Sequence, residues 1–165
     1  MKLNLGCGDK MRGGYLNIDA RPLPANGHQF LRADIRDLRG MINDGVVDEI
    51  VAWDVLEHMP RADAEAVLRN CLQLLKDGGT LEVKMPEIGA LMRWSEKQQD
   101  MKAVSFRWYG QHDVDPAWMY PQNVHQYCWA VDDFISTATR IGYELTASPE
   151  FCEEANAKYI LRKKR

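Results

Sequence analysis

Short apolar runs alternate with amphipathic helical patterns along this chain of 165 residues. The clearest run, residues 49–55, is bounded by polar residues and has the length of a buried strand. In residues 61–75 apolar side chains recur at helical spacing, and a further apolar run follows at residues 80–85. Strand, helix and strand in this order are typical of parallel pairing. The alternation therefore predicts an α/β fold with a mostly parallel sheet flanked by helices.

The remaining elements follow from the same patterns. The expected strands are residues 2–5, 15–18, 30–32, 49–55, 80–85, 144–147 and 158–162, and the expected helices are residues 61–75, 88 to about 99, and 131–141. We expect the last two strands to form an antiparallel pair. Residues 102–130 are irregular and rich in aromatic side chains, which is typical of a substrate-binding or lid segment. The length fits one domain, residues 1–165.

Composition narrows the classes of function. The net charge is −3, and basic residues are nearly absent from the aromatic segment, so nucleic acid is not an expected partner. We expect no membrane partner and a cytoplasmic location, because the sequence shows neither a leader nor a spanning segment. The four cysteines form no CxxC pair, and His125 with Cys128 offers only two ligands, so we expect no metal site.

Small and acidic residues follow the first three expected strands. The glycines of Leu5-Gly6-Cys7-Gly8 permit either a simple turn or close approach of a ligand. Asp19 ends the second strand, where its carboxylate can accept hydrogen bonds from both ribose hydroxyls or cap a turn. Asp34 follows the third strand and can either accept the exocyclic amine of an adenine or cap a helix. The order of these residues along the chain favours a nucleoside site.

Successive motifs of this sequence resemble those of the class I S-adenosylmethionine (SAM)-dependent methyltransferases, in particular compact members of the methyltransferase type 11-like subgroup. They are LNLGCG, NIDA, RADI, VDEIVAWDVLEHMP and LKDGGTLEVKMP, and they span roughly the first ninety residues. The resemblance implies SAM as cofactor and S-adenosylhomocysteine (SAH) as product. The cofactor-binding residues that it implies are Leu5, Gly6, Cys7 and Gly8 toward the methionine end, Asp19 and Ala20 at the ribose, Asp34 and Ile35 at the adenine, and Trp53, Asp54 and His58 near the sulfonium.

Two departures from the family pattern alter the expected fold. Too few residues separate Gly6 from Asp19 for the usual helix, so we expect a short loop there. The family's helices before the first strand are also missing, so one side of the pocket is expected to be open, or covered by a second copy in a homodimer or by a partner subunit. A nicotinamide cofactor is disfavoured, because Met11 stands where a dinucleotide fingerprint has its third glycine.

Methyl transfer needs an aligned acceptor and, for a hydroxyl or amine, removal of a proton. His125, His112 and His58 are the candidate bases, although each can equally be a hydrogen-bonded packing residue. Amide and aromatic side chains in the irregular segment suit a small-molecule acceptor, so we predict transfer to an oxygen or nitrogen atom of a sugar or glycan precursor. Two alternatives stay open: a methyltransferase acting on nucleic acid or protein, and a non-catalytic SAM-binding subunit of a partner enzyme.

Overall fold

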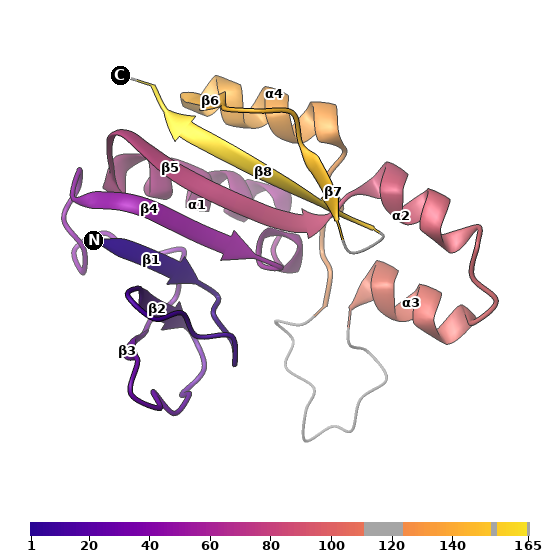
Figure 1. Ribbon diagram of the computed structural model, residues 1–165, viewed down its shortest axis with the longest axis horizontal. Helices are drawn as coiled ribbons and strands as arrows, with labels where there is room; N and C mark the ends of the chain where they lie inside the picture. The colour runs from indigo at the N-terminus through magenta and orange to yellow at the C-terminus, as the bar shows by residue number, and fades with distance from the viewer. Residues whose placement is uncertain (111–123, 153–154, 165) are drawn as a thin grey trace.

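The computed structural model describes residues 1–110, 124–152 and 155–164. These residues fold around an eight-stranded sheet with the strand order β3-β2-β1-β4-β5-β8-β6, and β7 pairs with β8 beside this path. The strands are β1 (Lys2–Leu5), β2 (Leu16–Asp19), β3 (Gln29–Arg32), β4 (Val47–Trp53), β5 (Leu75–Pro86), β6 (Tyr143–Leu145), β7 (Glu150–Cys152) and β8 (Asn156–Lys163). Figure 1 shows the sheet with β3 at one side and β6 at the other.

The first five strands pair in parallel, and β8 runs antiparallel to β5, β6 and β7. The predicted mostly parallel sheet with an antiparallel C-terminal pair is therefore confirmed. Leu5 at the end of β1 lies opposite Ile18 of β2 and Ala52 of β4. Parallel strands have their carboxyl ends at the same edge of the sheet. This register therefore gathers the residues that follow Leu5, Ile18 and Ala52 at that carboxyl edge.

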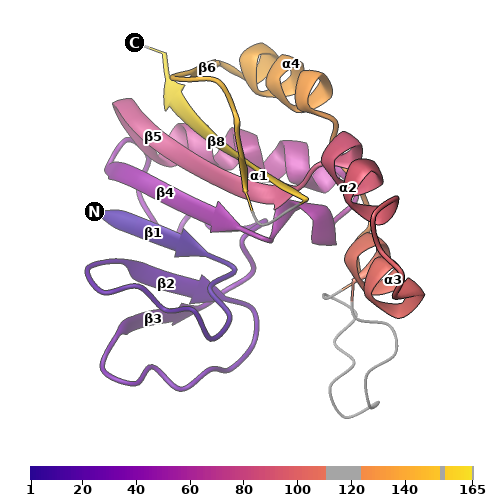
Figure 2. The same ribbon diagram turned by 45° about the vertical axis from the view of Figure 1, so that its right-hand side comes forward.

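The helices are α1 (Arg61–Leu74), α2 (Ile88–Ser95), α3 (Met101–Tyr109) and α4 (Val131–Ile141), and a short 3-10 turn, η1 (Leu56–His58), precedes α1. Helices α1 and α4 cover one face of the sheet, whereas α2 and α3 stand beyond the carboxyl ends of β4 and β5 (Figures 1 and 2). The apolar stripe of α1 is buried as its spacing predicts. It consists of Ala64, Val67, Leu68, Cys71 and Leu74.

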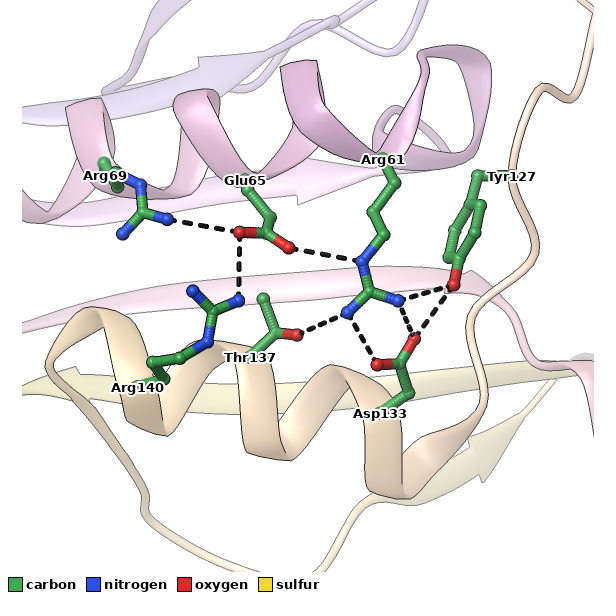
Figure 3. Close-up of polar contacts among 7 residues, drawn as sticks. All are labelled: Arg61, Glu65, Arg69, Tyr127, Asp133, Thr137 and Arg140. Carbon is green, nitrogen blue, oxygen red and sulfur yellow. Dashed lines mark hydrogen bonds and ion pairs between the residues drawn. The ribbon is translucent and has the colours of Figure 1, made fainter.

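A network of charged side chains ties α1 to α4 (Figure 3). The Arg61 guanidinium donates to both carboxylate oxygens of Asp133, at 2.6 and 2.7 Å, and to the Tyr127 hydroxyl at 2.7 Å. The Glu65 carboxylate accepts from Arg61 and, across the helix interface, from Arg140. Because Tyr127 precedes α4, the same network also holds the segment that leads into this helix.

Several elements differ from the prediction. Helix α2 ends at Ser95 instead of about residue 99, and strand β4 runs from Val47 to Trp53 instead of residues 49–55. Strand β5 begins at Leu75 instead of residue 80, because Leu75 pairs with Val47 and the chain passes directly from α1 into the sheet. Part of the segment expected to be irregular is the helix α3, whose first turn is capped by the Asp100 side chain. Strand β7 was not predicted. Residues 111–123 of the expected irregular segment lie outside the described residues.

The expected short loop between β1 and β2 is confirmed, and two buried asparagines hold it in place. Asn4 donates to the Asn17 side chain at 2.8 Å and to the Lys10 carbonyl at 3.1 Å. The Asn17 side chain in turn accepts from the Arg12 amide at 2.7 Å. These bonds fix the loop backbone without a helix. Among the described residues, no helix is both long and apolar enough to cross a membrane.

Candidate functional site

The turn after β1 brings the backbone of Gly6 and Gly8 to the carboxyl edge of the sheet. Both residues have positive φ, 57° and 52°. A Cβ atom on Gly6 would lie 2.6 Å from Cγ2 of Val55, so a larger residue there would need the neighbouring side chain to move. Between the glycines, burial raises the pKa of the Cys7 thiol to about 11, which keeps this sulfur protonated. The turn therefore presents main chain to the adjacent space.

The carboxylate of Asp19 lies at the end of β2, beside this turn. Its Oδ1 accepts from the Arg21 amide at 2.9 Å and from Arg21 Nε at 3.1 Å. Its Oδ2 accepts from the Gly8 amide at 2.9 Å and from Arg21 Nη2 at 3.3 Å. Burial acts to raise the pKa of Asp19, but these hydrogen bonds outweigh it and lower the pKa. Asp19 is thus an ionised, nearly buried acceptor.

Two adjoining cavities open at this edge of the sheet. The smaller, of about 400 Å³, contains the predicted adenosine-binding residues Asp19, Ala20, Asp34 and Ile35 in its lining. The larger, of about 600 Å³, contains Gly6, Cys7, Gly8, Trp53, Glu57 and His125. Gly6, Arg21, Asp54 and His58 line both cavities, so the two spaces meet at these residues.

Asp34 lies in the smaller cavity with its side chain half exposed. Its carboxylate accepts from Arg36 Nη2 at 2.5 Å and from the Arg36 amide at 2.9 Å. The side-chain hydrogen bond from Arg36 is the main reason that the pKa of Asp34 is lowered. No helix follows Asp34 in this described stretch, so the alternative role as a helix cap is wrong. The carboxylate is ionised and borders the cavity.

The end of β4 has an unusual backbone conformation at Asp54, which has a φ of 54°. Its amide donates to the Lys84 carbonyl at 2.7 Å, and Lys84 Nζ lies 3.2 Å from its Oδ2. Asn156 donates to Oδ1 at 3.2 Å. Positive φ in a residue other than glycine is uncommon and clusters at functional sites. Here it occurs at a residue that lines both cavities.

Glu57, His58 and His125 form a cluster at the wall of the larger cavity. The Glu57 side chain is buried, and its Oε2 has no hydrogen-bond partner among the described residues. Burial raises the pKa of Glu57 to about 8. The rings of His58 and His125 lie 5.0 Å apart between centroids. Burial lowers the pKa of both imidazoles, that of His125 to about 4, so both are neutral near pH 7.

Backbone hydrogen bonds bring this cluster together from distant parts of the chain. The amides of Gln126 and Tyr127 donate to the Glu57 carbonyl at 2.6 and 3.2 Å, and Gln126 Nε2 donates to the His58 carbonyl at 2.9 Å. The His125 amide donates to the Tyr109 carbonyl at 3.0 Å. His125 is therefore held between the end of α3 and η1.

The structure places most of the predicted site residues at these two cavities. Leu5 is the exception among the described residues, because its side chain is buried in the core. His112 lies outside the described residues. The sequence analysis missed Glu57, Arg21 and Arg12. A signal for Glu57 existed, since it is an acidic residue directly before His58 at the end of an apolar run.

Comparisons with known proteins show similarity to methyltransferases. A family model described as a methyltransferase domain matches residues 12–147. No curated protein is significantly similar to the chain in sequence. Among solved structures, a SAM-dependent methyltransferase from Methanosarcina mazei superposes with a TM-score of 0.69 and 15% identity, covering 99% of this chain and 92% of its own.

Two other similar structures contain bound molecules or partners. One is a Burkholderia thailandensis 1,6-didemethyltoxoflavin-N1-methyltransferase with bound 1,6-didemethyltoxoflavin and SAH, with a TM-score of 0.66, 12% identity and coverage of 99% and 71%. The other is a Haloferax volcanii complex of the Trm112 methyltransferase activator with a methyltransferase, with a TM-score of 0.66, 13% identity and coverage of 99% and 82%. With the family match and the sheet order, they lead to one conclusion: this chain belongs to the class I SAM-dependent methyltransferases.

Proposed function

We propose that this protein transfers the methyl group of SAM to an oxygen or nitrogen atom of a small molecule. The observation that carries the proposal is the junction of the two cavities at Gly6, Asp54 and His58. With its adenosine portion in the smaller cavity, SAM would have its sulfonium near this junction. The larger cavity would then hold the methionine portion of SAM and the methyl acceptor.

Each part of the cofactor has a chemically suitable group in this arrangement. Asp19 would accept hydrogen bonds from the ribose hydroxyls, while Asp34 would accept one from the adenine amine and Ile35 would pack against its ring. The backbone at Gly6 and Gly8 would face the methionine end. Leu5 would support this turn from the core, since its side chain does not reach the cavities.

The transfer itself is an in-line displacement in which the carbon–sulfur bond breaks as the new bond to the acceptor forms. Holding the two reactants in line supplies much of the rate acceleration, on the order of 7–11 kcal/mol in well-aligned cases. The proton released by a hydroxyl or amine needs an acceptor nearby. Of the predicted bases, His58 and His125 border the larger cavity and are neutral near pH 7; His112 remains a prediction from the sequence.

The lining of the larger cavity bears on the class of acceptor. Lys10 and Arg12 contribute positive charge, and Trp53 contributes an aromatic surface over which the Arg12 guanidinium lies at 4.1 Å. Such a lining suits a sugar derivative with a carboxylate or phosphate group. The small-molecule substrate of the similar Burkholderia enzyme is consistent with this proposal.

A second proposal is that this chain binds SAM but is active only in a complex. The similar Haloferax structure is a complex with an activator, so this chain would bind SAM and need a partner subunit, or a second copy, for activity. Turnover that appears only after a co-purifying partner is added would support this proposal.

The test is an assay with methyl-labelled SAM and a panel of sugar phosphates, sugar acids, nucleosides, RNA and protein. We expect label in one small-molecule class, and a loss of transfer in the Asp19→Ala variant, because it cannot hold the ribose. Label transferred only to RNA or protein would contradict the proposal. SAH binding without transfer to any acceptor would favour the second proposal.

A further inference from the structure

We propose that Glu57, His58 and His125 form a binding site for one divalent first-row transition cation, such as Zn²⁺, at the wall of the larger cavity. One ligand atom from each side chain lies within 4.8 Å of the corresponding atoms of the other two. In a tetrahedral zinc site, ligand atoms about 2.1 Å from the ion lie roughly 3.4 Å from one another. Side-chain adjustments of about an ångström would therefore close the cluster around an ion.

Each of the two histidines has one ring nitrogen beside a backbone carbonyl, as metal-bound histidines commonly do. His58 Nδ1 lies 3.3 Å from the Val124 carbonyl oxygen, and His125 Nδ1 lies 3.1 Å from the Trp108 carbonyl oxygen. A carbonyl oxygen can only accept, so each Nδ1 carries the proton and each Nε2 keeps a free lone pair. Backbone carbonyls that fix the tautomer in this way are typical of metal-bound histidines. Both imidazoles are thus preset to donate an electron pair.

The Glu57 carboxyl supplies the second observation that points to a ligand. Its side chain is only 1% exposed, and Oε2 has no hydrogen-bond partner among the described residues. Leaving a buried carboxyl oxygen without a partner is costly, and without a cation this carboxyl keeps its proton, which a metal ion would displace. The nearby cation Lys84 is paired with Asp54 at 3.2 Å. A bound cation would satisfy the Glu57 oxygen directly.

The cluster is also built rigidly. Glu57 and His58 lie in η1, and the amides of Gln126 and Tyr127 bind the Glu57 carbonyl. The same contacts place His125 beside η1, so the backbone that carries the ligands is held in position before an ion arrives, and only the side chains need to adjust. Preorganised ligands reduce the cost of binding.

The ligand set indicates the class of ion. Two imidazole nitrogens and one carboxylate oxygen suit Zn²⁺ and other first-row transition ions, whereas Mg²⁺ and Ca²⁺ prefer oxygen ligands alone. Three protein ligands leave at least one coordination position open, on the side of the larger cavity. This step alone rests on the proposed methyl transfer: an acceptor with a coordinating oxygen would bind at that position. With the ion bound, His58 and His125 would act as its ligands and not as bases, and the ion would lower the pKa of the coordinated hydroxyl.

The experiment uses protein stripped of metal with a chelator and then dialysed. Calorimetric titration with ZnCl₂ is expected to show one saturable site per chain, and CoCl₂ is expected to give visible absorption from bound Co²⁺. Glu57→Gln and His125→Gln should each weaken Zn²⁺ binding by at least ~100-fold, since loss of even an outer partner commonly costs 10- to 100-fold. His28→Gln is the matched control, because His28 precedes β3 and so lies at the amino ends of the parallel strands, away from the site at their carboxyl ends.

SAH titration of the same proteins separates this proposal from the proposed function and checks folding. Variants that bind SAH but no longer bind Zn²⁺ support the metal site. Wild-type protein that binds SAH but no Zn²⁺, or variants that bind Zn²⁺ as wild type does, would overturn it and leave the proposed methyl transfer intact. One-site Zn²⁺ binding that both substitutions abolish, without any SAH binding, would support the metal site and contradict the cofactor site.

Discussion

The Arg21 side chain closes over the Asp19 carboxylate, with Nε 3.1 Å from Oδ1 and Nη2 3.3 Å from Oδ2. Each carboxylate oxygen also accepts one backbone amide, from Arg21 and from Gly8. A carboxylate has about four acceptor positions, so all of them are in use. A ribose bound by Asp19 must therefore take the place of the Arg21 guanidinium.

This competition predicts that Arg21→Ala leaves SAH affinity unchanged or raises it by up to about tenfold, equivalent to one charge-assisted hydrogen bond. Calorimetric titration of wild type and Arg21→Ala with SAH measures the difference. A strong loss of affinity in Arg21→Ala would show instead that the guanidinium contacts the cofactor.

The turn after β1 should tolerate only glycine at position 6. We expect Gly6→Ala to destabilise the fold by about 2–5 kcal/mol, because positive φ costs an L-residue ~1–2 kcal/mol and the added methyl would press on Val55. Gly45→Ala is the control, since Gly45 also has positive φ but no atom within 4 Å of the Cβ position. Urea unfolding measures both variants, and equal losses would refute the proposed contact with Val55.

The network of Figure 3 should contribute to stability mainly through the paired contact of Arg61 with Asp133. Asp133→Asn is expected to lower the free energy of unfolding by about 1 kcal/mol, the upper part of the range for partly exposed ion pairs. Glu150→Gln removes a more exposed pair with Lys158 and should have a smaller effect. Denaturant titration compares them, and a larger loss from Glu150→Gln would contradict this ranking.

The pair of Arg61 and Asp133 also predicts how stability depends on pH. The hydrogen bond from Arg61 holds the pKa of Asp133 below its usual range, so the folded state binds this proton more weakly than the unfolded state. The resulting stabilisation is complete above the unfolded pKa of about 3.9 and is lost as the pH falls through the lower folded pKa. The stability difference between wild type and Asp133→Asn should therefore shrink below about pH 4. A difference that is constant from pH 7 to pH 3 would contradict this origin.

The sequence predicted the strands of the parallel half of the sheet well, because each is a short local run bounded by polar residues or glycine. Helix α3 was missed because it has no fully buried residue, so no apolar stripe marks it, and its cap at Asp100 is a single polar residue. The start of β5 was missed for another reason. Pairing of Leu75 with Val47 draws the Gly78-Gly79 stretch into a strand that local propensity disfavours.

The site was predictable where it depends on the ends of strands. Gly6, Asp19 and Asp54 each follow an apolar run, and parallel pairing alone brings them together. Glu57 also follows an apolar run, but its burial could not be predicted, because it depends on residues 124–127, which fold back onto η1 from 66 or more positions away. Contacts of that range leave no periodic pattern in a single sequence.

Calorimetric titration with SAH of the wild-type protein and of Asp19→Ala is the most direct test of the cofactor site. We predict one site per chain in the wild type and an affinity at least ~100-fold lower in Asp19→Ala, since about 3 kcal/mol of charge-assisted hydrogen bonding to the ribose is lost. Asp44→Ala, at an exposed loop position, should bind as wild type does. Wild-type protein that does not bind SAH, or an Asp19→Ala variant that binds it with unchanged affinity, would contradict the account.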